Sequence, residues 1–179
     1  MQIIQKILSL LKTLLGLHKQ KLEIVQEDVV DKPVKEYEPE PEDLLTNTEK
    51  IYRVAAVTLG KDISTLIDNE VACAEVMSGI INQAIPDFSA GVLSTADLNI
   101  KLKNSPYFRQ ELEPSEGAII VSPRTATIYG HTGCFLSAGA IASNNSKTGK
   151  FEVNYNFDTW ATTFGAKGRG LKIYIYKAI

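Results

Sequence analysis

The chain has 179 residues, of which 44% are hydrophobic and 22% are charged, and its formal net charge is −2. This much apolar sequence can form one core and excludes disorder of the whole chain, which requires low hydrophobicity and high net charge. The 2 Cys, 12 Gly and 7 Pro residues exclude a disulfide scaffold and a collagen-like repeat, and the near-neutral charge predicts no nucleic-acid partner.

The N-terminal segment, residues 1–22, predicts an amphipathic helix, because its apolar residues recur at spacings of three and four with polar residues between them. Its apolar runs are short and Lys12 interrupts them, which argues against a membrane-spanning helix and against a cleavable signal peptide. Three uses of this helix remain open: contact with a membrane surface, pairing with a partner helix, or packing on the chain's own domain. The oligomeric state remains open with them.

A linker is predicted over residues 23–46. Its acidic residues alternate with three prolines, which favours an extended, self-repelling tether. Residues 1–43 hold 6 Lys and 9 Asp or Glu, a net charge of −3, whereas the rest of the chain carries +1. This change in charge indicates a domain boundary, and we expect the globular domain over residues 47–179.

The globular part predicts helices first and strands afterwards, which is the order of an α+β domain. Apolar residues at helical spacing predict the helices, and short apolar runs between Gly, Asn and Pro turn signals predict the strands. The helices are expected at residues 48–59, from Asp68 or Asn69 to Pro86, at 93–102 after a Ser94 or Thr95 cap, and at 158–164; the strands are expected at 118–121, 133–136, 140–142, 151–155 and 171–176.

Two side chains carry the candidate chemistry. Cys73 falls within about one turn of the start of the second predicted helix, where free backbone N–H groups and the helix dipole favour a thiolate and lower its pKa. His131 is the one histidine in the predicted domain, and an imidazole beside a thiolate stabilises the anion and moves the proton. Each residue alone also has a structural explanation, as a small buried apolar side chain and as a turn residue.

A third polar residue is needed to orient the imidazole. Asn144 and Asn145 follow His131 by one short hairpin, so a neighbouring strand can place either of them behind the ring. The order Cys73, His131, Asn144, with Asn145 as the alternative, therefore predicts a nucleophilic catalytic site. Whether Cys73 ever pairs with the other cysteine, Cys134, remains open.

Four segments of the domain resemble a known family. They are NEVACAE at residues 69–75, PSEGAIIVSP at 114–123, GHTG at 130–133 and SNNSKTG at 143–149. Together they resemble the papain-like peptidoglycan hydrolases of the NlpC-type and CHAP families, especially the versions encoded by phages and prophages. The resemblance covers the chain from Thr48 to its C-terminus. It departs from the family pattern at Ala72, Ala118 and Cys134, and none of these departures removes a catalytic group.

The resemblance implies an α+β, papain-like fold in which N-terminal helices pack on a small antiparallel sheet. It also implies an endolysin-like cysteine endopeptidase or amidase, a thiol protease that cleaves an amide bond in the peptide part of peptidoglycan during cell-wall degradation. Carried over, Cys73 is the nucleophile, His131 is the base and acid, and Asn144 or Asn145 orients His131. The resemblance implies no metal and no cofactor.

A second hypothesis is a non-catalytic virion or assembly component of a phage, tethered through the helix at residues 1–22. For either hypothesis we expect a protein made in the bacterial cytoplasm that acts at the cell wall or is carried in a virion. Neither the bond cleaved nor the host follows from the sequence.

Overall fold

The computed structural model describes residues 44–68, 71–136 and 139–179, which all belong to one compact unit. The helix predicted at residues 1–22 and nearly all of the linker predicted at 23–46 lie outside the described residues, so both stay predictions. None of the helices in the described segments is long and apolar enough to cross a membrane.

The described residues form a six-stranded sheet in which all neighbouring strands are antiparallel. The strands are β1 (Phe108–Glu111), β2 (Ile119–Ser122), β3 (His131–Phe135), β4 (Ala140–Asn144), β5 (Phe151–Asn156) and β6 (Tyr174–Ala178). Their order in the sheet is β1-β6-β2-β3-β4-β5. The C-terminal strand is therefore inserted between β1 and β2, which leaves β1 and β5 as the edges.

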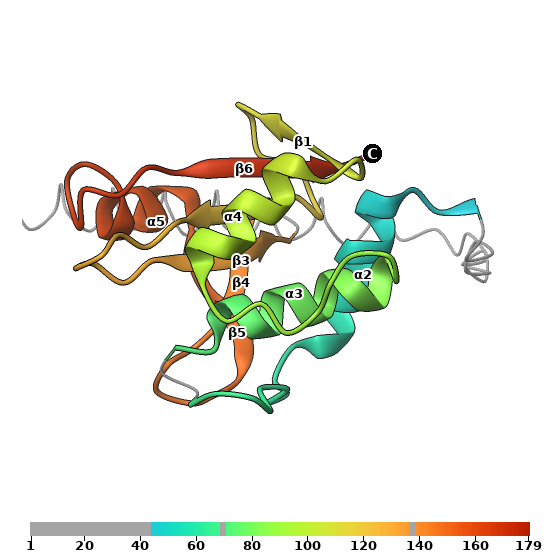
Figure 1. Cartoon of the computed structure of the whole chain (residues 1–179), viewed down its shortest axis with the longest axis horizontal. Helices are drawn as coiled ribbons and strands as arrows, with labels where there is room; N and C mark the ends of the chain where they lie inside the picture. Colours follow the sequence, from blue (N-terminus) through green and yellow to red (C-terminus); the bar gives the residue numbers. More distant parts are fainter. Residues whose placement is uncertain (1–43, 69–70, 137–138) are drawn as a thin grey trace, which may run out of the picture. The chain divides into compact units, whose positions relative to one another are not determined.

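Four helices accompany the sheet in the described segments. They are α2 (Asn47–Thr58), α3 (Cys73–Ala84), α4 (Thr95–Asn104) and α5 (Phe157–Phe164). The first three precede all the strands, and α3 and α4 lie in front of the strands in Figure 1. The predicted order of helices followed by strands, and with it the α+β class, is confirmed. The predicted Ser94 cap of α4 is also confirmed, since the Ser94 side chain accepts a hydrogen bond from Ala96 N–H.

Three strands differ from the sequence prediction, and one of them is β6, which begins at Tyr174 and not at residue 171. The sequence does not predict β1, because only Phe108 of its four residues is buried, and Arg109 and Gln110 are exposed at the edge of the sheet. Strand β3 begins at His131, earlier than the apolar run suggests, because its ladder with β2 continues to the pair of Ser122 and His131. The candidate histidine thus lies on a strand.

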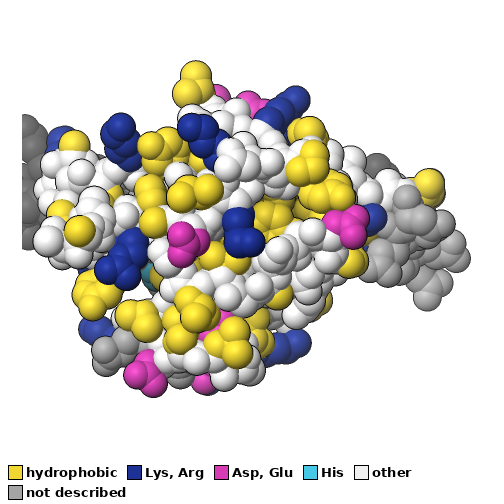
Figure 2. All heavy atoms as spheres, in the orientation of Figure 1, with side chains coloured by type: hydrophobic (Ala, Val, Ile, Leu, Met, Phe, Trp, Pro, Cys, Tyr) yellow, Lys and Arg dark blue, Asp and Glu magenta, His cyan; other side chains and the backbone are white. Residues whose placement is uncertain are grey.

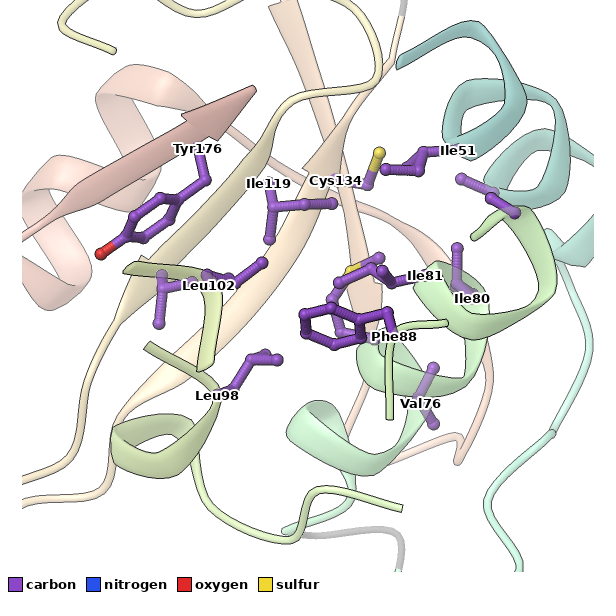
Figure 3. Packing of buried hydrophobic residues seen from close by; sticks show 14 of the residues in the cluster. Ile51, Val76, Ile80, Ile81, Phe88, Leu98, Leu102, Ile119, Cys134 and Tyr176 are labelled. Atoms are coloured by element: carbon purple, nitrogen blue, oxygen red, sulfur yellow. The ribbon is translucent and has the colours of Figure 1, made fainter. Parts of the chain in front are cut away.

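Buried apolar side chains cover both faces of the sheet. Neighbouring residues of a strand point to opposite faces, and Ile119 and Ile120 of β2 accordingly belong to two different apolar clusters. The larger cluster packs α2, α3 and α4 on one face; Figure 3 shows residues of it. The smaller cluster packs Trp160 and Phe164 of α5 on the other face. The candidate site lies where residues from both faces meet at one end of β3.

Candidate active site

Cys73 is the first residue of α3. The helix begins later than predicted, and just before it Val71 N–H donates a hydrogen bond to the Asp68 carbonyl (3.0 Å). The N-cap residue, Ala72, makes no side-chain hydrogen bond to the first turn. The start of α3 therefore presents backbone N–H donors and the positive end of the helix dipole beside the cysteine.

Glu75 holds the first turn of α3 in place, and its side chain is only 5% exposed. Its carboxylate accepts hydrogen bonds from the backbone N–H groups of Thr65 and Leu66 (2.7 and 2.8 Å) and from the hydroxyls of Ser64 and Thr65 (2.9 and 3.2 Å). Burial raises the pKa of Glu75, but these hydrogen bonds outweigh that effect and hold the pKa below its usual value. The loop at residues 64–66 is thus tied to the helical turn that carries Cys73.

His131 is held at the start of β3 by its neighbours on the sheet and on α5. Its ring stacks on those of Trp160 and Phe164, with centroid separations of 5.3 and 5.1 Å. Trp160 is itself fixed, because its indole N–H donates to Ser122 Oγ (3.0 Å). Gly130 precedes the histidine, and a Cβ at that position would overlap the Ser122 carbonyl oxygen. Aromatic packing and a close backbone approach therefore fix the position of the imidazole.

Ser143 makes the side-chain hydrogen bond to His131. The distance from His131 Nε2 to Ser143 Oγ is 2.9 Å, and Ser143 Oγ donates its proton to Asn154 Oδ1 on β5 (2.7 Å). A hydroxyl has one proton to donate, so this hydrogen-bond network assigns the acceptor role to Ser143 and the imidazole proton to Nε2 of His131. The other ring nitrogen, Nδ1, is then the proton acceptor of the neutral ring.

Asn144 and Asn145, the predicted orienting residues, occupy other places. Asn144 is buried and is adjacent to Ser143 on β4, so its side chain points to the opposite face of the sheet. Asn145 lies in the turn after β4, where its side chain donates to Glu152 and accepts from Lys147 N–H. Among the described residues, the side-chain hydrogen bond of His131 is thus the one to Ser143, and an orienting role of Asn144 or Asn145 stays a prediction.

One pocket of about 830 Å³ brings Cys73 and His131 together. The backbone N–H of Thr132, the residue after His131, is close enough to the Cys73 thiol to lower its pKa. The Tyr155 ring packs edge-on against the His131 ring at 5.7 Å and is close enough to Cys73 for a thiolate there to raise the Tyr155 pKa. The described lining residues are Ile67, Val71, Cys73, Leu93, Ser94, Thr95, Arg124, Tyr129, Gly130, His131, Ser146, Lys147, Tyr155, Phe164 and Arg169.

Both candidate catalytic groups are neutral in this structure near pH 7. Burial raises the pKa of the Cys73 thiol to about 11, against hydrogen bonds from the backbone N–H groups of Thr132, Ala74 and Cys73 itself. Burial, together with the smaller effect of the positive charge of Arg169, lowers the pKa of His131 to about 4. The lowered pKa predicted for Cys73 is therefore wrong for the resting state, because burial outweighs the effect of the helix start.

The second cysteine of the domain, Cys134, is not among the described residues that line the pocket. Cys73 and Cys134 are both free thiols, and Cys134 is buried on β3 in the larger apolar cluster. Within residues 44–68, 71–136 and 139–179, no group of three or more His, Cys, Asp and Glu side chains is placed to hold a metal ion. The described part of the site is thus a thiol, an imidazole and hydrogen-bonding groups.

Sequence reasoning missed Ser143, Asn154 and Arg169 as members of the site. Ser143 and Asn154 become partners through the pairing of β4 with β5, in which a bulge between Ile141 and Ala142 changes the register. A bulge of this kind cannot be read from the hydrophobic pattern, so the sequence carries no signal for the pair. Arg169 lies on a loop before β6 and reaches the site through the tertiary fold.

No family model and no curated protein sequence matches this chain. A chain in the crystal structure of the type VI native effector–immunity complex Tae3–Tai3 from Ralstonia pickettii is similar in structure, with 14% sequence identity and a TM-score of 0.49. The similarity covers 74% of this chain and 98% of that chain.

Proposed function

We propose that the chain is a cysteine hydrolase that cleaves an amide bond in the peptide part of peptidoglycan and acts at the bacterial cell wall. One observation carries the hydrolytic part of this proposal: a cysteine at an uncapped helix start and a histidine on a strand line the same pocket. Peptidoglycan is proposed as the substrate because four segments of the chain resemble the NlpC-type and CHAP hydrolases. These segments are residues 69–75, 114–123, 130–133 and 143–149.

The neutral pair defines the first chemical step. When a substrate occupies the pocket, Nδ1 of His131 accepts the thiol proton while Cys73 Sγ attacks the amide carbonyl carbon. The imidazolium then donates this proton to the leaving nitrogen, the C–N bond breaks, and a thioester remains on Cys73. Water attacks the thioester with His131 as base, which releases the carboxylic acid and restores the thiol and the neutral imidazole.

The start of α3 suits the negative charge that develops on the carbonyl oxygen. The backbone N–H of Cys73 is in the first turn, whose donors are not capped by the Ala72 side chain. Donors fixed in this way stabilise an oxyanion without reorganising during the reaction. They also stabilise the thiolate that forms transiently as the proton moves to His131.

Ser143 and Asn154 are positioning residues in this mechanism. Their hydrogen bonds hold the imidazole proton on Nε2, which keeps Nδ1 free to accept the thiol proton. Ser143 thereby takes the part that the sequence assigns to Asn144 or Asn145. The His131 ring is also stacked on Trp160 and Phe164. Stacking and hydrogen bonding together prevent a flip of the ring that would exchange Nδ1 and Nε2.

The proposal is tested by the loss of turbidity of purified bacterial cell walls, with soluble products identified by mass spectrometry. We expect cleavage by the wild type and none by Cys73→Ala or His131→Ala. Cys134→Ala is the matched control, because it removes the other free thiol outside the pocket, and it should keep the activity if folded. Equal activity of wild type and Cys73→Ala would contradict the proposal.

A non-catalytic, tethered component is the second candidate function. The observation that favours it is the buried, neutral Cys73 thiol, which is not reactive in the resting state. Under this alternative none of the variants changes the cell walls, and the wild type releases no product. The same assay therefore separates the two candidates.

A further inference from the structure

Arg169 reaches the site from a tight loop that follows α5. Its backbone N–H donates a hydrogen bond to the Thr163 carbonyl (3.0 Å), which folds the loop back on the end of the helix. The glycines on both sides of Arg169 make this path possible. A Cβ at Gly168 would overlap the carbonyl oxygens of Thr162 and Thr163, and Gly170 has a positive φ of 72°. The loop thus fixes the point from which the Arg169 side chain leaves the backbone.

The Arg169 guanidinium makes two contacts that lead to the candidate catalytic histidine. It donates a hydrogen bond to the carbonyl of Tyr129 (3.0 Å), which precedes His131 by two residues. It also lies over the Phe164 ring, 5.0 Å from the ring centroid, and the Phe164 ring stacks on His131 with centroids 5.1 Å apart. Arg169 therefore contacts both the loop that leads into β3 and a ring on which the imidazole packs.

A planar guanidinium suits both contacts. It can stack on an aromatic face while its edge donates hydrogen bonds, whereas the ammonium group of lysine is a compact, strongly hydrated point charge. Arg169→Lys therefore keeps the charge and loses this geometry. Arg169→Gln loses both the geometry and the charge. The two substitutions separate the contacts of Arg169 from its charge.

The charge of Arg169 also acts on His131. Burial is the larger cause of the lowered His131 pKa, and the positive charge of Arg169 lowers the pKa in the same direction. On the face drawn in Figure 2, Lys and Arg side chains are spread among hydrophobic ones, so one substitution changes the charge locally. A cation beside an imidazole disfavours the imidazolium and keeps the ring able to accept a proton. The other described titratable groups that line the pocket are Cys73, Arg124, Tyr129, Lys147 and Tyr155.

We propose that Arg169 is a positioning residue of the catalytic histidine, which it holds in place through the Tyr129 carbonyl and the Phe164 ring. Its charge acts toward the same end, because it favours the neutral imidazole that accepts the thiol proton. This inference rests on the proposed function and adds to it a residue that acts through its neighbours on the base.

Nuclear magnetic resonance of the imidazole signals tests the effect of the charge without any substrate. The full chain has two histidines, and the signal that is missing from His131→Gln belongs to His131. We expect Arg169→Gln to shift the His131 titration to higher pH and Arg169→Lys to leave it close to that of the wild type. Lys167→Gln is the matched control, because Lys167 is an exposed cation on the same loop and is not among the described residues that line the pocket.

Hydrolysis of soluble peptidoglycan fragments tests the effect of the contacts. Both Arg169→Gln and Arg169→Lys should lower kcat about five- to tenfold at unchanged KM, which is the loss of one hydrogen bond that places the base. Only Arg169→Gln should also move the acidic limb of the kcat profile to higher pH. Circular dichroism checks that each variant folds, and Arg169→Lys keeps the test valid if Arg169→Gln does not fold.

Several outcomes would overturn the inference. They are an unchanged His131 titration in Arg169→Gln, an equal shift in Lys167→Gln, and an unchanged kcat in both Arg169 variants. A rise in KM at unchanged kcat would assign Arg169 to substrate binding and would overturn it as well. Failure of the proposed function has a different signature, because the wild type then releases no product while the imidazole titrations still decide whether Arg169 acts on His131.

Discussion

The protonation state of His131 gives a prediction that does not depend on any activity. A pKa of about 4 means that the folded chain binds no proton at His131 near pH 5, whereas an exposed histidine in the unfolded chain titrates near 6.5. Between these two values the unfolded state binds more protons, so the free energy of unfolding must fall as the pH falls. From pH 7.5 to pH 5 the expected loss is about 2 kcal/mol.

The opposite sign would mark a thiolate–imidazolium pair. If Cys73 were ionised beside a protonated His131, the pKa of His131 would rise above 6.5, and its contribution to stability would disappear as the pH rises through that raised value. The two resting states therefore predict opposite slopes in the same pH window. Carboxylates contribute little there, because their pKa values lie near 4.

Urea unfolding measures this slope, with the fluorescence of Trp160, the one tryptophan of the chain, as the probe. His131→Gln is the control, since its amide can donate to Ser143 but does not titrate. We expect the wild type to lose about 2 kcal/mol more than His131→Gln between pH 7.5 and 5. A difference near zero, or an imidazole NMR signal of His131 that titrates above pH 6.5, would refute the neutral pair.

Three further predictions follow from the site. Ser143→Ala should lower kcat about tenfold at unchanged KM, because the imidazole proton is no longer held on Nε2. Ser143→Thr should restore part of the rate, because it keeps a hydroxyl. A rise in KM of about tenfold in Ser143→Ala would contradict a positioning role. Glu75→Ala should destabilise the fold by about 3 kcal/mol and Glu75→Gln by about 1 kcal/mol, because the amide keeps the acceptor for the two backbone N–H groups. The lowered pKa of Glu75 means that its carboxylate stabilises the fold above its unfolded pKa, near 4.3, and that this contribution is lost as the pH falls below it, so urea unfolding of Glu75→Gln should be less sensitive to acid. Gly130→Ala should cost about 2 kcal/mol in the same measurement, because its Cβ overlaps backbone, and an unchanged stability would show that the loop adjusts freely.

The sequence predicts the elements of this fold better than its contacts. The apolar runs that became β2 and β4 and the apolar spacing of α3 are local patterns, and burial of those same residues confirms them. Strand β1 has no such pattern, because it forms an edge by pairing with the C-terminal strand β6, more than 60 positions away. Sequence patterns report burial along one element, and they carry no signal for a partner that far along the chain.

In the candidate site too, the sequence predicts single residues better than the contacts between them. Cys73 and His131 could be predicted because each has an unusual side chain at the start of an element, and one pocket does bring them together. The residue that meets His131 depends on which residues of β4 share its face of the sheet: Ser143 lies within hydrogen-bond distance of His131, and the next residue of a strand, Asn144, is expected on the other face. A register shift of one residue in a strand moves every side chain to the opposite face of the sheet. The sequence therefore predicts that the orienting residue lies near Ser143 and Asn144, but it does not predict which of the two contacts His131. The protonation states of Cys73 and His131 are harder still to predict from the sequence. The burial of Cys73 and the effect of the Arg169 charge on His131 arise only when segments distant in the sequence pack together.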